Sequence, residues 1–135
     1  MFHRVLFILL LSLSIVSDAL ANVKHVAVLE FRGVDVNQAI LMKLSDQPRV
    51  AASEVLPKDQ YFIMTRENMT EILNDMGKDA SCMEGQWEIE VGRNVGADYV
   101  MTVDDMKVDG TYFLPVQLYD TLPGSLLKAR SVEAD

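Results

Sequence analysis

The stretch that decides the fold is YVMTVDDMKVDGTYFLPVQLY, residues 99–119. Side chains alternate in polarity on both sides of Asp109-Gly110, a dipeptide that favours a two-residue turn between antiparallel strands. The sequence therefore predicts a hairpin of residues 99–108 and 111–119, with Gly110 in its turn. One face of the second strand carries Tyr112, Leu114, Val116 and Leu118.

A third strand is predicted after this hairpin. Residues 120–125 (DTLPGS) have the composition of a turn, and residues 126–132 alternate again. Pro115 has no amide hydrogen to give to a ladder, so its strand is expected either at a sheet edge or with the proline in a non-bonded position. An open edge at 112–119 or 126–132 would accept a partner strand.

Upstream of the hairpin, strands and helices alternate. Residues 24–31 (KHVAVLEF) are apolar on both faces, which is typical of a central strand, and residues 60–64 (QYFIM) predict another. Apolar residues at helical spacing predict helices at 35–54, 66–76 and 86–95. The order β-α-β-α-α-β-β-β indicates one α/β (α+β) domain of two or three layers. Its mixed sheet ends in an antiparallel meander.

The first predicted helix carries three further expectations. Asp35 is placed at its N-cap. Pro48 removes one backbone donor and clashes with the carbonyl four residues earlier, so a kink or a break is expected there. The stripe expected to be buried consists of Val36, Ile40, Leu44, Ala51 and Val55.

Four other residues are expected at turns and caps. Thr65 is placed at the N-cap of the second helix, and Gly77 directly after its end. Gly96 closes the third helix before the long hairpin. Gly33 ends the first strand, where glycine permits a turn with positive φ.

Residues 1–21 have the layout of a secretory signal peptide. Arg4 precedes an apolar run from Val5 to Val16, and Ala19-Leu20-Ala21 offers small residues at the −3 and −1 positions. The run is shorter than the about 20 residues that span a bilayer. We expect cleavage between Ala21 and Asn22, and no stable membrane insertion. The mature domain, residues 22–135, is then expected in the periplasm or secreted.

Charge and cysteine usage exclude several functions. The net charge is −8 with no Lys/Arg cluster, so nucleic acid is not an expected partner, because its binding depends on basic groups. Cys82 is the only cysteine and has no partner for an internal disulfide. We expect it to pack as a small apolar residue.

The sequence contains no recognisable catalytic set. His25 is the only histidine after the signal segment, and with Cys82 it is too little for a zinc site. Asp104 and Asp105 point to opposite faces of a strand, so they do not pair simply as acid and base. We therefore expect no enzyme, no cofactor and no metal.

Three segments together resemble a known family. They are VAVLEFRG (26–33), YFIMTRENM (61–69) and GADYV (96–100). They are similar to the periplasmic α/β domain shared by the TolB amino-terminal domain, the CsgG family and LpoB-type activators of penicillin-binding proteins. The resemblance covers residues 24–133 and implies a function through protein–protein contacts.

The sequence departs from this family in two places. Related modules tend to carry a second cysteine where Trp87 stands, so the loop disulfide that the resemblance implies is not available to Cys82. Pro48 also interrupts a helix that the family runs straight.

The sequence leaves three functional interpretations open. The first is an exported module that docks another envelope protein, with Tyr112, Phe113 and Tyr119 as candidate contacts. The second is a small exported hydrolase that uses carboxylates or a metal. The third is a non-functional fragment of a larger envelope protein, because no closing element follows residues 126–132 and the domain is expected to be truncated there.

Overall fold

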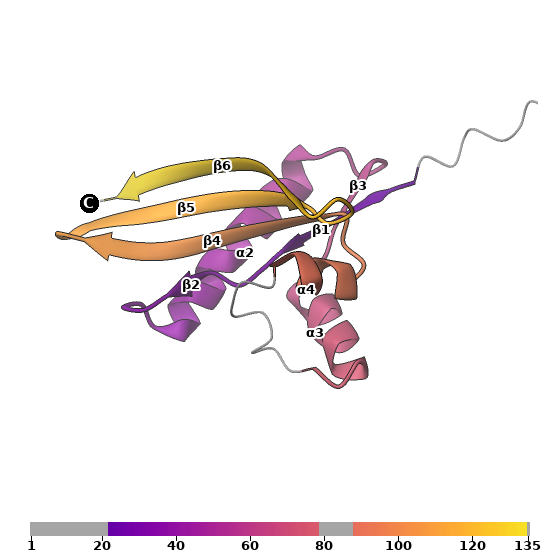
Figure 1. Cartoon of the computed structure of the whole chain (residues 1–135), viewed down its shortest axis with the longest axis horizontal. Coiled ribbons are helices and arrows are strands. Elements are labelled where there is room, and N and C mark those ends of the chain that lie inside the picture. Colours follow the sequence, from indigo (N-terminus) through magenta and orange to yellow (C-terminus); the bar gives the residue numbers. More distant parts are fainter. Residues whose placement is uncertain (1–21, 79–87, 135) are drawn as a thin grey trace, which may run out of the picture.

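A six-stranded mixed sheet organises the molecule (Figure 1). The computed structural model describes residues 22–78 and 88–134 of the 135-residue chain. The elements, in chain order, are β1 (Lys24–Val28), β2 (Arg32–Gly33), α2 (Gln38–Val55), β3 (Tyr61–Ile63), α3 (Arg66–Asp75), α4 (Glu88–Asn94), β4 (Tyr99–Val108), β5 (Thr111–Asp120) and β6 (Ser125–Ala134). The predicted mixed α/β class and the closing antiparallel meander are confirmed.

The sheet has the strand order β3-β1-β4-β5-β6, and β2 pairs with β4 beside this path. β1 lies parallel to both neighbours, with Lys24 opposite Tyr61 and Val26 opposite Tyr99. β4, β5 and β6 form an antiparallel meander. The first predicted strand is therefore central, as expected from its two apolar faces.

The helices cover β1, β3 and the neighbouring ends of β4 and β5. On one face, Ala27 and Leu29, in β1 and directly after it, join a buried cluster with Met69 and Leu73 of α3 and Val91 of α4. On the other face lies α2, which contacts β1 and β3. Beyond this layered part, β4, β5 and β6 extend away from α3 and α4 (Figure 1). β5 is half-buried along its length, and the described side chains of β6 are exposed.

Helix α2 begins later than predicted and runs through its proline. Its N-cap is Asn37, whose side chain accepts a hydrogen bond from the Ala39 amide at 2.8 Å, and not Asp35. The helix continues through Pro48 to Val55, so the expected break does not occur. Ser45 and Arg49, on either side of the proline, both bond to backbone groups of the segment after β1 or at its end. Pro48 removes one hydrogen bond within the helix, and the bonds of Ser45 and Arg49 hold the helical turns around it in place.

The buried stripe of α2 also differs from the prediction. Its buried residues are Leu41, Ser45 and Arg49, whereas the predicted stripe is exposed from Ile40 to Val55, with 51% of Ile40 and 79% of Val55 accessible. The reason is that α2 covers unpaired backbone groups as well as apolar side chains. Ser45 Oγ accepts from the Phe31 amide at 2.7 Å, and Arg49 donates to the Val28 carbonyl at 2.6 Å.

The strand containing Pro115 lies inside the sheet, between β4 and β6, and not at the edge. The β4–β5 register has paired residues on either side of Asp104 and Asp105, opposite Leu114 and Pro115, but no pair at these positions. The proline, which has no amide hydrogen, thus sits at this gap in the β4–β5 ladder.

Gly33 has a different role from the expected one. It does not have a positive φ, unlike Gly77, Gly96 and Gly110. It lies in β2, where an added Cβ would be 3.0 Å from Cβ of Asp105. The residue therefore permits a close approach of two strands, and the turn that was expected there is a short parallel strand.

Candidate functional site

Two arginines share two carboxylates where β1 ends, and this ion cluster joins three elements. Arg66, at the start of α3, contacts Glu30 at 2.6 Å and Asp46 at 2.9 Å. Arg49 of α2 contacts the same carboxylates at 3.0 Å and 2.8 Å. Arg66 also donates to the Met42 carbonyl at 2.8 Å. The cluster therefore fixes α2 and α3 against the end of β1.

The electrostatics of this cluster are those of a structural site. Burial alone would raise the pKa of Glu30, but hydrogen bonds and positive charge from Arg66 and Arg49 outweigh it, and the pKa is lowered. Burial likewise opposes ionisation of Asp46, and the same two arginines outweigh it and lower the pKa of this carboxyl. Both carboxyl groups are ionised at neutral pH, so neither is a general acid.

A second cluster surrounds Arg32. Its guanidinium contacts Glu88 at 2.9 Å and Asp104 at 2.7 Å, which joins β2 to α4 and β4. Tyr119 lies close to these charges, and burial followed by the negative charge of Glu88 raises its pKa. Asp105 lies on the opposite face of β4 from Asp104. The two carboxylates therefore do not converge into an acid/base pair.

The described ranges offer no other chemistry of the kind considered from the sequence. Within residues 22–78 and 88–134, no group of three or more His, Cys, Asp or Glu side chains is arranged to hold a metal. His25 packs against Phe62, with ring centroids 5.2 Å apart. Cys82, Trp87 and the expected signal segment 1–21 lie outside the described residues.

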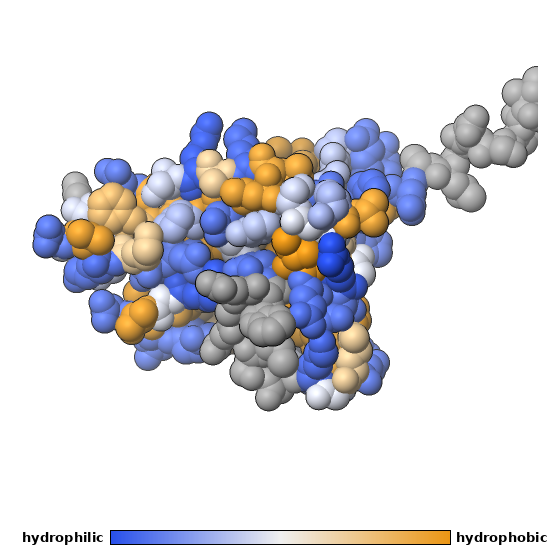
Figure 2. Space-filling view, viewed as in Figure 1, coloured by the Kyte–Doolittle hydropathy of each residue, from blue (hydrophilic) through white to orange (hydrophobic). Residues whose placement is uncertain are grey.

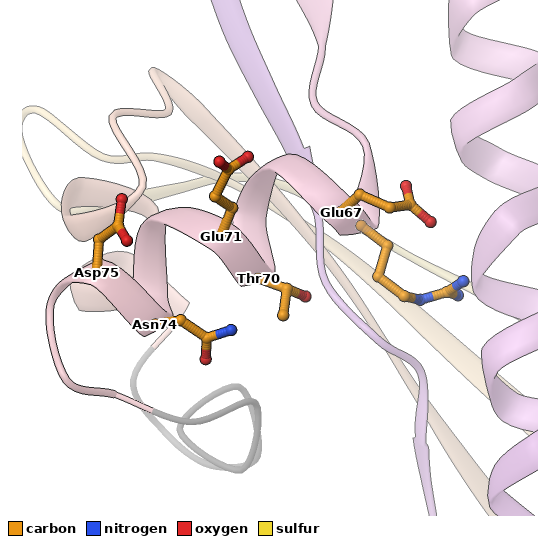
Figure 3. A pocket seen from close by; sticks show the side chains of 6 residues that line it. Glu67, Thr70, Glu71, Asn74 and Asp75 are labelled. Atoms are coloured by element: carbon orange, nitrogen blue, oxygen red, sulfur yellow. The ribbon is translucent and has the colours of Figure 1, made fainter.

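A surface depression follows one side of α3 (Figure 3). Its lining consists of Arg66, Glu67, Thr70, Glu71, Asn74 and Asp75. The labelled side chains project outward along the helix without meeting at a common point (Figure 3). Arg66, the one cation in the lining, is already held by Glu30 and Asp46. This depression therefore has no arrangement that would orient a reacting group.

The turn and cap residues have structural positions. Thr65 caps α3, since its hydroxyl accepts from the Asn68 amide at 3.2 Å and the Asn68 side chain completes a capping box. Gly77 follows α3 with φ 69°, Gly96 follows α4 with φ 75°, and Gly110 lies in the hairpin turn with φ 91°. All of these residues shape the backbone, and none of them carries a reactive group.

The candidate contact aromatics all lie on β5 but on two faces. Tyr112 is opposite Lys107, whose ammonium lies 4.8 Å from its ring centroid. Phe113 and Tyr119 are an odd number of residues away and therefore face the other side, where Tyr119 is opposite buried Val100. The structure thus brings Phe113 and Tyr119 to one face and separates Tyr112 from them. A partner on a single face contacts at most two of the three.

The most distinctive surface is the outer edge of β6. Among the described residues, no strand pairs with this edge, although β6 is ten residues long. Leu126, Leu127 and Val132 are each about half exposed along it. In Figure 2 hydrophilic side chains project among apolar ones along the side of the molecule where β6 runs. A long uncovered edge is the usual place where a β-sheet accepts another strand.

Sequence reasoning found the strands of this edge but missed the two ion clusters. Arg49 recurs at four-residue spacing with Leu41 and Ser45, and this mixed stripe was the available signal for the first cluster. The second cluster depends on β2, a two-residue strand that is too short to leave a periodic pattern.

No family model and no curated protein sequence matches the chain. Solved structures do show the same fold. The LpoB C-terminal domain from Escherichia coli aligns with a TM-score of 0.65 at 15% identity, covering 93% of each chain. Lipoprotein GNA1162 from Neisseria meningitidis aligns with a TM-score of 0.58 at 16% identity, covering 82% of this chain and 78% of the other.

These similarities establish an LpoB-like fold. They support the LpoB-like part of the resemblance seen in the sequence and do not specifically support its TolB-like or CsgG-like parts. In the described residues, no helix combines the length and the apolar character that a membrane span requires.

Proposed function

We propose that this chain is an exported, non-catalytic module that docks another protein of the cell envelope. The LpoB-like fold supports an envelope role, and the signal-like residues 1–21 support export. Both ion clusters in the described part of the chain connect elements of the fold, and the carboxylates that line the depression along α3 do not meet at a common point (Figure 3). Docking is therefore the function that the surface supports best.

The observation that carries this proposal is the uncovered outer edge of β6. Ten residues of extended backbone, with exposed side chains on both faces, offer a row of hydrogen-bonding groups to a partner strand. The edge is held rigidly, because β6 pairs with β5 along its length and β5 pairs with β4. Phe113 and Tyr119 on one face, and Tyr112 on the other, are the proposed flanking side-chain contacts.

A proline scan tests the edge without changing its charge. Amide hydrogens of consecutive strand residues point to opposite sides, so of Ser131→Pro and Val132→Pro only one removes a bond to β5. That variant is expected to lose thermal stability, while the other keeps it and blocks only the outer edge. We call the stable one of these two proline variants the edge-blocked variant.

The function is tested by cross-linking in the native envelope and identifying the proteins that co-purify. The wild type is expected to retain a reproducible partner that the edge-blocked variant loses. Alanine substitution of Phe113 and of Tyr112, made separately, reports which face of the sheet the partner covers. Retention of the same partner by the edge-blocked variant would refute docking through β6.

A further inference from the structure

Resting on the docking function above, we infer that β6 accepts an acidic strand in which apolar residues alternate with carboxylates, and that it does not accept a second copy of itself. Three properties of the molecule support this inference. They are the lack of ion pairs at Lys128 and Arg130 among the described residues, the face that these two cations share, and the registers that a pair of β6 strands would adopt.

Five of the eleven lysines and arginines in the described part of the chain are paired with carboxylates within the fold. Lys24, Arg32, Arg49, Arg66 and Lys78 each contact a carboxylate within 4 Å. On β6, in contrast, neither Lys128 nor Arg130 has an ion pair with any described residue. Two exposed cations thus lie on the open edge strand of a chain whose net charge is −8.

Lys128 and Arg130 share one face of the sheet. They lie opposite Leu118 and Val116 of β5, and Val116 is in turn opposite buried Val103 of β4. Val132, half exposed, continues the same face opposite Leu114. The strand therefore presents, at every second position, two positive charges and then an apolar side chain.

A strand added at this edge would place its own side chains close to these residues. Side chains directly opposite each other on adjacent strands have Cβ atoms about 4.5–5.5 Å apart, and opposite charges there are stabilising. Carboxylates facing Lys128 and Arg130, followed by an apolar residue facing Val132, would complement this face. The opposite face carries Ala129, Ser131 and Glu133, which leaves room for larger apolar side chains beside the two small residues.

The same charges disfavour pairing of β6 with a second copy. A two-fold axis perpendicular to the sheet pairs residues of the same face, so near-complete overlap places Arg130 opposite Arg130 or opposite Lys128. Like charges in directly opposite positions are destabilising. Registers that avoid these contacts leave part of each ten-residue β6 unpaired.

The ladder irregularity at Leu118 and Tyr119 adds to this discrimination. It shifts the register of β5 against β6 near Leu126 and Leu127, the more apolar end of the edge strand. Such irregularities bend a strand and increase its twist, which hinders the flat edge-to-edge contact of two identical strands. The edge is therefore protected against self-association while its cationic part stays accessible.

The inference is tested with two fluorescent decapeptides, one alternating Glu with Val and the other alternating Lys with Val. Binding to the purified protein is followed by fluorescence anisotropy at low and high salt, and the binding site by amide chemical shifts. The Glu peptide is expected to bind with shifts confined to β6 and β5, and more weakly in high salt. The Lys peptide is not expected to bind.

Reversing the two charges on β6 then distinguishes binding at this edge from a general effect of the protein's net charge. The double variant Lys128→Glu with Arg130→Glu is expected to bind the Glu peptide with about tenfold lower affinity. It is also expected to bind the Lys peptide, which the wild type does not. The matched control is Lys43→Glu with Lys58→Glu. It changes the net charge equally, at exposed lysines that make no ion pair with described residues, and should leave both affinities unchanged.

Two results would overturn the inference: equal binding of the Glu peptide by the edge-reversed variant and the wild type, or equal weakening by the control pair. A dimer in sedimentation that the edge-blocked variant abolishes would also overturn it, in favour of self-pairing. These outcomes differ from the one that would refute docking through β6, which is capture of the same envelope partner by the edge-blocked variant.

Discussion

Replacing Gly92 by alanine should destabilise the protein, although alanine is the better helix former. Gly92 lies in α4, where it faces β4 and the turn after β5. A Cβ at this position would be 2.2 Å from Cγ2 of Val100 and 2.7 Å from Cγ2 of Thr121. Ordinary van der Waals contact begins at 3.4 Å, so α4 or its neighbours must move by about 1 Å.

Neither neighbour moves easily. Val100 has no exposed surface and is paired with both Ala27 and Tyr119 in the sheet. Thr121 is 4% exposed, and its hydroxyl donates to the Ala97 carbonyl at 2.6 Å. Overpacking of this kind costs about 1–3 kcal/mol, whereas the change from glycine to alanine in a helix gains at most about 1 kcal/mol. The expected net loss is about 1–2 kcal/mol, or roughly 5–10 °C in Tm.

A double-mutant cycle with Val100→Ala measures the clash itself. Urea unfolding followed by circular dichroism gives the free energy of unfolding of the wild type, both single variants and the double variant. Because Val100→Ala removes Cγ2, Gly92→Ala should cost less in that background than in the wild type. Gly96→Ala is the control, since its Cβ meets no atom within 4 Å and its cost comes from a φ of 75°. A rise in Tm on Gly92→Ala, or equal costs in both backgrounds, would refute the reasoning.

Two further predictions concern the ion cluster and the start of α2. The pKa of Glu30 is lower in the folded state than its value of 4.5 in the unfolded chain. Ionised Glu30 therefore stabilises the fold above pH 4.5, and this contribution is lost as the pH falls through the folded-state pKa. Glu30→Gln should lower the free energy of unfolding by about 2 kcal/mol, measured by urea unfolding at pH 7. This is less than the loss of a fully buried ion pair, because Asp46 still contacts both arginines. The variant should also lose less stability than the wild type as the pH falls below about 4. By the same measurement, Asn37→Ala should lower the free energy of unfolding by about 1 kcal/mol, because Asn37 caps α2. Asp35→Ala should lower it by less than about 0.5 kcal/mol. A larger loss for Asp35→Ala than for Asn37→Ala would indicate that Asp35 is the cap.

The hairpin and the central strand were accessible from the sequence because they depend on local signals. The Asp109-Gly110 turn and the alternation around it predict β4 and β5, and the two apolar faces of residues 24–31 predict a central strand. These patterns are produced by the covering of a sheet face, which is a property of each strand alone. The overall class therefore followed directly.

The orientation of α2 was not accessible in this way. Apolar periodicity selected the stripe through Ile40 and Val55, which is exposed, and passed over Leu41, Ser45 and Arg49, which are buried. A serine and an arginine are buried there because the end of β1 presents an amide and a carbonyl that need partners. That requirement arises from another part of the chain, so a pattern within the helix does not reveal it.

The candidate site was predictable only in outline. The sequence identified residues 112–119 and 126–132 as possible open edges, and the sheet order assigns the edge to β6. The division of Tyr112 from Phe113 and Tyr119 follows from strand alternation and was available in advance. The lack of carboxylate partners for Lys128 and Arg130 among the described residues depends on tertiary placement, and required the structure.

The central position of β1 also has a consequence for how the chain reaches its folded state. The meander of β4, β5 and β6 consists of neighbouring hairpins, which close over short loops, whereas β1 pairs Lys24 with Tyr61 and Val26 with Tyr99. Contacts distant in sequence form slowly, because the loop must be closed before the contacts compensate for its entropy. The first strand to be synthesised is thus the one that waits for the most distant partner, and until β4 is in place one of its edges has nothing to pair with.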